Sequence, residues 1–198
     1  MKKGLKTTLI VVAIILVIII TFGSAYNKLV KADESVANAW AQVENVYQRR
    51  SDLIPNLVNT VQGAANFEKS TLTDVIEARA KATSIQVDPT NLSEENIAAF
   101  QKAQDGLSSA LSRLLVSIER YPELKANQNF LELQAQLEGT ENRIAVERNK
   151  FNNQVKEYNT YIRSFPRNIV AVMFNFDKKG YFQAQEGADK APSVDFNF

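Results

Sequence analysis

The sequence predicts an all-α protein: an antiparallel four-helix bundle with coiled-coil-like packing, preceded by one transmembrane helix. Three observations predict it. One uncharged apolar run lies near the N-terminus, apolar residues then recur at alternating steps of three and four, and only 5 prolines and 7 glycines interrupt 198 residues. Steps of three and four are typical of helices packed at a shallow angle, and scarce proline and glycine permit long helices.

The N-terminal apolar run has the length of a membrane span. Between Lys6 and Lys28 lie 21 residues without a charge, and a helix rising about 1.5 Å per residue then crosses a hydrocarbon core of about 30 Å. A cleaved signal peptide is the alternative, with Gly23-Ser24-Ala25 as the cleavage site, but its apolar region is usually only about 7–15 residues long. We therefore expect residues 1–6 to be a short cytoplasmic N-terminus and residues 7–25 a retained transmembrane helix.

The lysines around this run predict its orientation. Three lysines precede it and two follow it (Lys2, Lys3 and Lys6, then Lys28 and Lys31). Because cytoplasmic flanks carry the excess of lysine and arginine, we expect the N-terminus in the cytoplasm and the body outside it.

The first apolar seam of the body crosses a proline. It consists of Tyr26, Leu29, Asp33, Val36, Trp40, Val43, Tyr47, Arg50, Ile54, Leu57 and Val61. Since proline breaks or kinks a helix interior, Pro55 predicts one helix ending near Arg50 and a second from about Asp52 to Ala82. The seam nevertheless continues in phase across Pro55, so a long kinked helical hairpin is the alternative.

Two further helices follow the predicted loop at residues 83–93. Ser93 is a candidate N-cap, and Tyr121-Pro122 and Pro166 predict where the two helices end. The third helix has its seam at Ile97, Phe100, Gln104, Leu107, Leu111, Leu114, Ile118 and Tyr121. The fourth has it at Phe130, Leu133, Leu137, Ile144, Phe151, Val155, Tyr158, Ile162 and Phe165.

The C-terminal region allows two interpretations at two places. The apolar stretch 169–174 either packs against the end of the bundle, which we favour, or lies on the bilayer surface. Residues 26–182 are the predicted bundle domain and residues 183–198 a flexible tail. The tail ends in an alternating motif at Pro192, Val194 and Phe196, which could add as a strand to a partner's sheet.

Composition excludes several kinds of chemistry. The chain has no cysteine and no histidine, which removes disulfides, thiolate nucleophiles and the commonest metal ligand and general base. Its formal charge of +1, spread along the chain, provides no basic face for nucleic acid. We therefore predict no catalytic, cofactor or metal site, no nucleic-acid partner and no small-molecule substrate.

Arg50 is the main candidate site residue because its charge falls on an apolar seam. A buried arginine must be paired, and Glu147 occupies a matching seam position on the fourth helix, so one hypothesis is a structural Arg50–Glu147 ion pair. The other is an exposed interaction patch at the Pro55 break, made of Arg49, Arg50, Asp52 and Asn56.

The chain resembles the bacterial LemA family. The similar stretches are Tyr26-Asn27-Lys28-Leu29-Val30, Ala39-Trp40, Arg49-Arg50-Ser51-Asp52-Leu53-Ile54-Pro55-Asn56-Leu57-Val58, Ala78-Arg79, Tyr121-Pro122-Glu123-Leu124-Lys125-Ala126, Glu141-Asn142-Arg143-Ile144-Ala145, Tyr158-Asn159 and Phe165-Pro166. It departs at Asn66-Phe67-Glu68, where relatives often carry His-Glu. The resemblance implies a single-pass membrane protein with a four-helix body, and no settled activity. We expect the protein in the bacterial inner membrane.

These observations favour a membrane-anchored interaction or scaffold protein of the bacterial envelope, held by lipid contacts of residues 7–25. Its expected partner is another protein or a second copy of the chain. One alternative is an envelope sensor that signals through its anchor. The other is a hydrolase using carboxylates or Ser/Lys chemistry, for which the sequence shows no motif.

Overall fold

The computed structural model describes residues 2–63 and 67–184, and within them it confirms the all-helical prediction. No strand occurs in these ranges. The helices are α1 (Lys2–Gln62), α2 (Lys69–Ser84), α3 (Glu94–Ile118), α4 (Pro122–Lys125), α5 (Gln128–Arg163) and α6 (Arg167–Met173).

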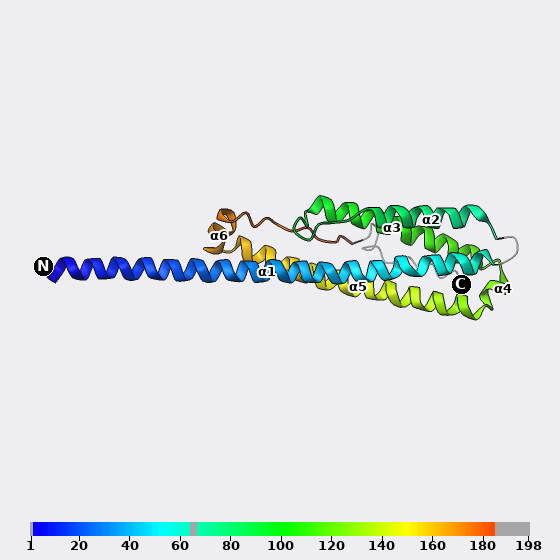
Figure 1. Cartoon of the computed structure of the whole chain (residues 1–198), viewed down its shortest axis with the longest axis horizontal. Coiled ribbons are helices and arrows are strands. Elements are labelled where there is room, and N and C mark those ends of the chain that lie inside the picture. The colour runs from blue at the N-terminus through cyan, green and yellow to red at the C-terminus, as the bar shows by residue number, and fades with distance from the viewer. Residues whose placement is uncertain (1, 64–66, 185–198) are drawn as a thin grey trace, which may run out of the picture.

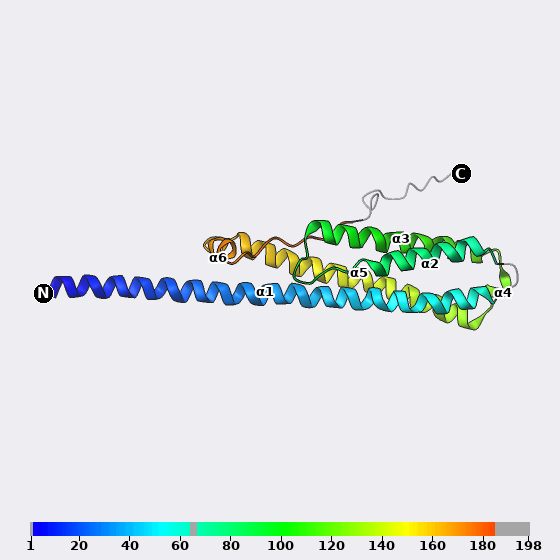
Figure 2. The same ribbon diagram turned by 45° about the horizontal axis from the view of Figure 1, so that its top comes forward.

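The long helices lie side by side around α1. Helix α5 runs back along α1, while α2 and α3 pair with each other beside the C-terminal half of α1 (Figures 1 and 2). Helix α4 lies at one end of this body, and α6 packs on α1 at the other. The first part of α1 extends well beyond α6 and touches no other element (Figure 1).

This projecting segment, residues 4–21 of α1, is exposed along its whole length. It contains an 18-residue window with mean hydropathy 2.8, none of it buried in the protein. α1 is therefore long and apolar enough to cross a membrane, and burial within the body begins only with Phe22 and Ala25.

The three predicted seams account for most of the core. On α1, every seam residue from Val36 to Val61 is buried, Arg50 included. The core has two clusters. One surrounds Trp40 and takes in α1, α5, α6 and the start of α3; the other surrounds Leu57 and takes in α1, α2, α3 and α5. Two seam residues, Tyr26 and Phe165, are exposed, and Phe165 lies beyond the end of α5.

The predicted break at Pro55 is wrong. α1 continues through Pro55 to Gln62, and the next helix starts only at Lys69. A proline in a helix interior leaves the carbonyl four residues earlier without its usual partner. Here that carbonyl belongs to Ser51, and the Arg79 Nε of α2 donates a hydrogen bond to it at 2.9 Å. The helix instead ends one residue before Gly63, a residue type that commonly follows helix ends.

The other predicted boundaries agree with the structure to within a few residues. The Ser93 side chain accepts a hydrogen bond from the Asn96 amide, which confirms it as the N-cap of α3. Pro122 opens the short helix α4, and Asn127 caps α5 in the same way as Ser93 caps α3. These ends follow directly from the local capping chemistry.

The apolar stretch 169–174 divides between the two predicted interpretations. Val170 and Ala171 are buried against α1 and α5, as the packing interpretation requires. Ile169, Val172 and Met173 are exposed on the side of α6 away from the core, and Phe174, directly after α6, is exposed beside Tyr26 of α1.

Candidate functional site

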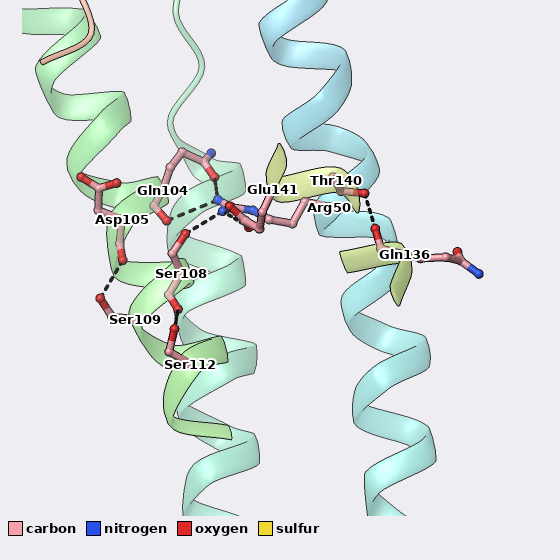
Figure 3. A network of polar contacts seen from close by, with 9 residues as sticks. All are labelled: Arg50, Gln104, Asp105, Ser108, Ser109, Ser112, Gln136, Thr140 and Glu141. Carbon is pink, nitrogen blue, oxygen red and sulfur yellow. Dashed lines mark hydrogen bonds and ion pairs between the residues drawn. The ribbon is translucent and has the colours of Figure 1, made fainter. Parts of the chain in front are cut away.

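A buried arginine joins the four long helices at mid-height. The Arg50 guanidinium of α1 donates hydrogen bonds to Ser108 Oγ (2.7 Å) and Gln104 Oε1 (2.6 Å) on α3, and to Glu141 Oε1 (2.7 Å) on α5 (Figure 3). A longer bond of 3.3 Å reaches the Gln104 carbonyl. Gln104 in turn donates to the Ala82 carbonyl at the end of α2.

The sequence places these groups together through the seams. Arg50 and Gln104 both occupy seam positions, so each points into the core of the body. Ser108 lies one turn after Gln104 on α3, and Glu141 lies on the adjoining face of α5. The network thus combines two buried seam residues with two residues at the edge of the core.

The two charged groups of the network differ in their exposure to solvent. The Arg50 side chain is 1% exposed, whereas the Glu141 side chain is 44% exposed. Water therefore reaches the carboxylate but not the guanidinium, whose Nε has no hydrogen-bond partner. The Tyr47 ring covers the guanidinium, with 5.0 Å between Cζ and the ring centroid. Burial raises the pKa of the Tyr47 hydroxyl, against the opposing charges of Arg148 and Arg50.

The predicted ion pair joined Arg50 to the wrong carboxylate. Glu147 instead pairs with Lys150 one turn along α5, with 2.8 Å between Lys150 Nζ and Glu147 Oε1. Glu141 and Glu147 are six residues apart, which is about 9 Å along a helix. The seam identified the correct helix, but spacing within one helix does not fix its height relative to another.

The predicted interaction patch is not formed as one surface. Arg49, Asp52 and Asn56 are exposed, while Arg50 is buried on the opposite side of α1. Because α1 stays helical through Pro55, consecutive residues point in different directions. The predicted tail motif at Pro192, Val194 and Phe196 lies outside the described residues.

The extended segment 176–184, which follows α6, is held by side-chain amides that the sequence analysis did not assign. Asn152 and Asn159 on α5, and Gln101 on α3, each exchange two hydrogen bonds with its backbone, an amide donating to each side-chain oxygen and a carbonyl accepting from each side-chain nitrogen. The sequence did offer one indication of such contacts, the asparagine-rich stretch of α5. Asparagine is a poor helix former, so several in one helix indicate a role for their side-chain amides.

These amide contacts position two side chains of the segment. The Phe182 ring packs against both Trp40 and Phe151, with its centroid 6.0 and 5.5 Å from theirs. Lys179 pairs with Asp33 of α1 at 3.1 Å. Gly180 lies so close to α3 that an added Cβ would come within 2.6 Å of the Glu94 Cα.

A cavity adjoins the arginine network. It has a volume of about 570 Å³ and lies between α1, the α2–α3 loop and α3, with Glu44, Tyr47, Ser51 and Gln104 among its lining residues. The Ser51 hydroxyl is buried there without a hydrogen-bond partner. Burial raises the pKa of Glu44, with the nearby Trp40 indole acting in the opposite direction.

A larger groove follows the outer side of the α1–α5 pair. Its volume is about 1120 Å³ and its lining is mostly amide, hydroxyl and charged side chains, among them Asn38, Gln42, Lys150, Asn153 and Glu157. Within the described residues, no three carboxylates are close enough to hold a metal ion. The groove offers hydrogen-bonding groups and charges of both signs.

The fold and these sites define a class of protein: an all-helical body continuous with one exposed helix apolar enough to cross a membrane. Residues 39–196 match the model of the LemA family. The chain belongs to the LemA family.

Two relatives extend this comparison over most of the chain. Protein LemA of Metamycoplasma hominis is 27% identical over 192 residues, covering 93% of this chain and 84% of that protein. Magnetosome protein MamQ 2 of Paramagnetospirillum magneticum is 25% identical over 206 residues, covering 94% of this chain and 76% of that protein.

Proposed function

We propose that this protein is a membrane-anchored helical scaffold of the bacterial envelope, which binds a protein partner or a second copy of itself and performs no catalysis. The observation that carries the proposal is the continuity of α1. One helix of 61 residues contains both the apolar projecting segment and the part of α1 against which the other helices of the body pack.

The interior of the body supports a structural role. The α1 seam faces α5 over much of its length, so the helices act as one antiparallel bundle with coiled-coil-like packing. Arg50 is enclosed by hydrogen-bonding partners from two other helices. Since both terminal nitrogens of Arg50 donate to the protein's own groups, the network is better suited to fixing helix register than to binding a ligand.

The outer groove between α1 and α5 is the surface we assign to the partner. Asn38 on α1 and Asn153 on α5 are exposed on its two walls. The adjacent pair Lys150 and Glu147 adds charges of both signs. Such a polar, mixed surface favours a specific protein contact over nonspecific attraction to a polyanion.

The names of the relatives define neither a partner nor a site of action. Protein LemA carries only a family name, and the MamQ proteins are named as magnetosome proteins. We propose that the present chain is held in the membrane by the apolar part of α1, with the N-terminus in the cytoplasm and the body outside.

Co-purification from native membranes tests this function. A tagged wild-type chain should retain a reproducible partner, or an untagged second copy, and Asn153→Arg should release it by placing a bulky charge in the groove. Asn142→Arg is the matched control, because Asn142 is an exposed asparagine of the same helix outside the groove. Equal retention by both variants, or no retained protein with the wild type, would overturn the proposal.

Protease digestion tests the orientation separately. In spheroplasts treated with external protease, the body should be digested while cytoplasmic proteins remain intact. Full protection of the body would reverse the proposed orientation and favour the sensor alternative.

A further inference from the structure

The short helix α6 presents an apolar face to the outside. Val172 is 79% exposed and Met173 63%, and the preceding Phe165 is 82% exposed. Ile169 and Phe174 are exposed beside them. Single exposed apolar residues are ordinary on protein surfaces, but five large ones within the ten residues 165–174 indicate a contact surface.

This face has a fixed position on the body. Val170 and Ala171, on the opposite side of α6, are buried against α1 and α5. The Phe174 ring lies against the Tyr26 ring of α1, with 4.7 Å between centroids. The apolar face therefore cannot turn inward without breaking these contacts.

The contacts of α6 lie at the end of the apolar part of α1. The uncharged stretch ends at Asn27, and Phe22, Ala25 and Tyr26 make the first contacts with the body. If those 21 uncharged residues span a hydrocarbon core of about 30 Å, their last turn lies at its boundary with the headgroups. Helix α6 is then beside α1 at that boundary (Figure 1).

The residues around this face are those found at membrane surfaces. Between Tyr161 and Phe176 the only charged residues are Arg163 and Arg167, both basic. The Arg167 guanidinium lies over the Tyr161 ring, with 4.3 Å between Cζ and the centroid. Aromatic rings and basic side chains are enriched where a protein meets the headgroup layer, and basic residues are attracted to anionic lipids.

We infer that α6, together with Phe165 and Phe174, contacts the outer part of the same bilayer that α1 crosses. Val172 and Met173 then reach toward the acyl chains, while Arg163 and Arg167 lie among the headgroups. The inference rests on the proposed membrane anchor and adds a second attachment, which limits tilting of the body relative to the bilayer. A bilayer is favoured over a second copy because the face adjoins the apolar projecting segment.

The absence of cysteine makes a direct test simple. The full-length chain is reconstituted into vesicles of phosphatidylcholine and phosphatidylglycerol, with one environment-sensitive fluorophore on Val172→Cys. Matched positions are Val12→Cys in the projecting segment and Val116→Cys near the far end of α3, where valine is also exposed. Quenching by lipids carrying a nitroxide at the headgroup or on the acyl chain is compared at the three positions.

We expect strong quenching by the nitroxide lipids at Val12 and little at Val116. At Val172 we expect quenching several-fold above that at Val116, and strongest with the nitroxide at the headgroup. If Val12 is quenched and Val172 behaves like Val116, the anchor stands and the α6 contact is overturned. Energy transfer between labels at Val172 on two chains, without lipid quenching, would assign the face to a second copy and also overturn it. Failure of quenching at Val12 would overturn the anchor and this inference together.

Discussion

Arg79 Nε donates a hydrogen bond to the carbonyl of Ser51, the group that Pro55 deprives of its usual intrahelical partner. The donor comes from a different helix, 28 residues along the chain. A helix break that proline would ordinarily cause is therefore prevented by a tertiary contact, and α1 remains one element.

Replacing Arg79 should destabilise the protein mainly through Pro55. We expect Arg79→Met to lower the free energy of unfolding by about 1–3 kcal/mol, because a half-buried carbonyl loses its donor. In a Pro55→Ala background the new amide can bond Ser51, so the same change should cost much less. Denaturant unfolding of the four proteins measures this coupling; equal costs in both backgrounds would contradict it.

The arginine network should respond unequally to loss of its two charges. Glu141→Gln leaves the buried Arg50 cation with neutral partners and should approach the cost of about 3–5 kcal/mol for breaking a buried pair. Arg50→Met should cost less, since Glu141 is half exposed and can be hydrated. The double variant should be more stable than the sum of the two losses predicts.

Glu138→Gln is the control for this comparison, because Glu138 is an exposed carboxylate on the same helix. It should change the free energy of unfolding by no more than about 0.5 kcal/mol. A Glu141→Gln effect no larger than that of the control would show that the ion pair contributes nothing to stability.

Glu44 should make the stability of the protein depend on pH. Burial raises its pKa in the folded state, so the folded protein binds the proton more tightly than the unfolded chain. The stability this contributes is complete at pH below the unfolded pKa and is lost as pH rises through the folded pKa. Glu44→Gln, which stays neutral, should therefore raise Tm at pH 7, and the gain should disappear near pH 3.

The matched control is Glu34→Gln on the exposed side of the same helix, which gives the effect of removing a surface carboxylate. Thermal unfolding of all three proteins at both pH values provides the measurement. A Glu44→Gln protein with unchanged or lower Tm at pH 7, relative to this control, would contradict the prediction.

Asn152 should hold the segment that carries Phe182. Its side-chain amide bonds both the Phe182 amide and the Phe182 carbonyl at 2.9 Å, so Asn152→Ala should speed hydrogen exchange of the Phe182 amide and cost about 1–2 kcal/mol. Asn153→Ala removes the neighbouring exposed amide and should leave that exchange unchanged. Equal protection in both variants would show that ring packing alone holds the segment.

The helices were predictable because their information is local and repeated. Spacing placed Trp40 and Leu107 in the core, and Ser93 marked the start of α3 by its own capping chemistry. Pro55 misled because its compensating donor, Arg79, lies on another helix. The partner of Arg50 was predicted wrongly because heptad spacing shows which face of a helix is buried but does not determine how far one helix is shifted along its axis relative to another.

The extended segment after α6 was the least predictable part. Its backbone is satisfied by side chains of Gln101, Asn152 and Asn159 rather than by a periodic ladder. Such contacts leave no repeat in the sequence. The need for glycine at position 180 was equally unpredictable, because it arises from the close approach of Glu94, which is distant in the sequence.

Because α1 is one unbroken helix, the rotation of its projecting segment about the helix axis is fixed relative to the body. Each residue of an α-helix advances about 1.5 Å and turns about 100°. A single residue inserted into the projecting segment would therefore leave every contact of the body intact, yet rotate the apolar side chains that precede it by more than a quarter of a turn. The direction in which each side of the projecting segment faces and the direction in which the α1–α5 groove opens are thus fixed relative to each other.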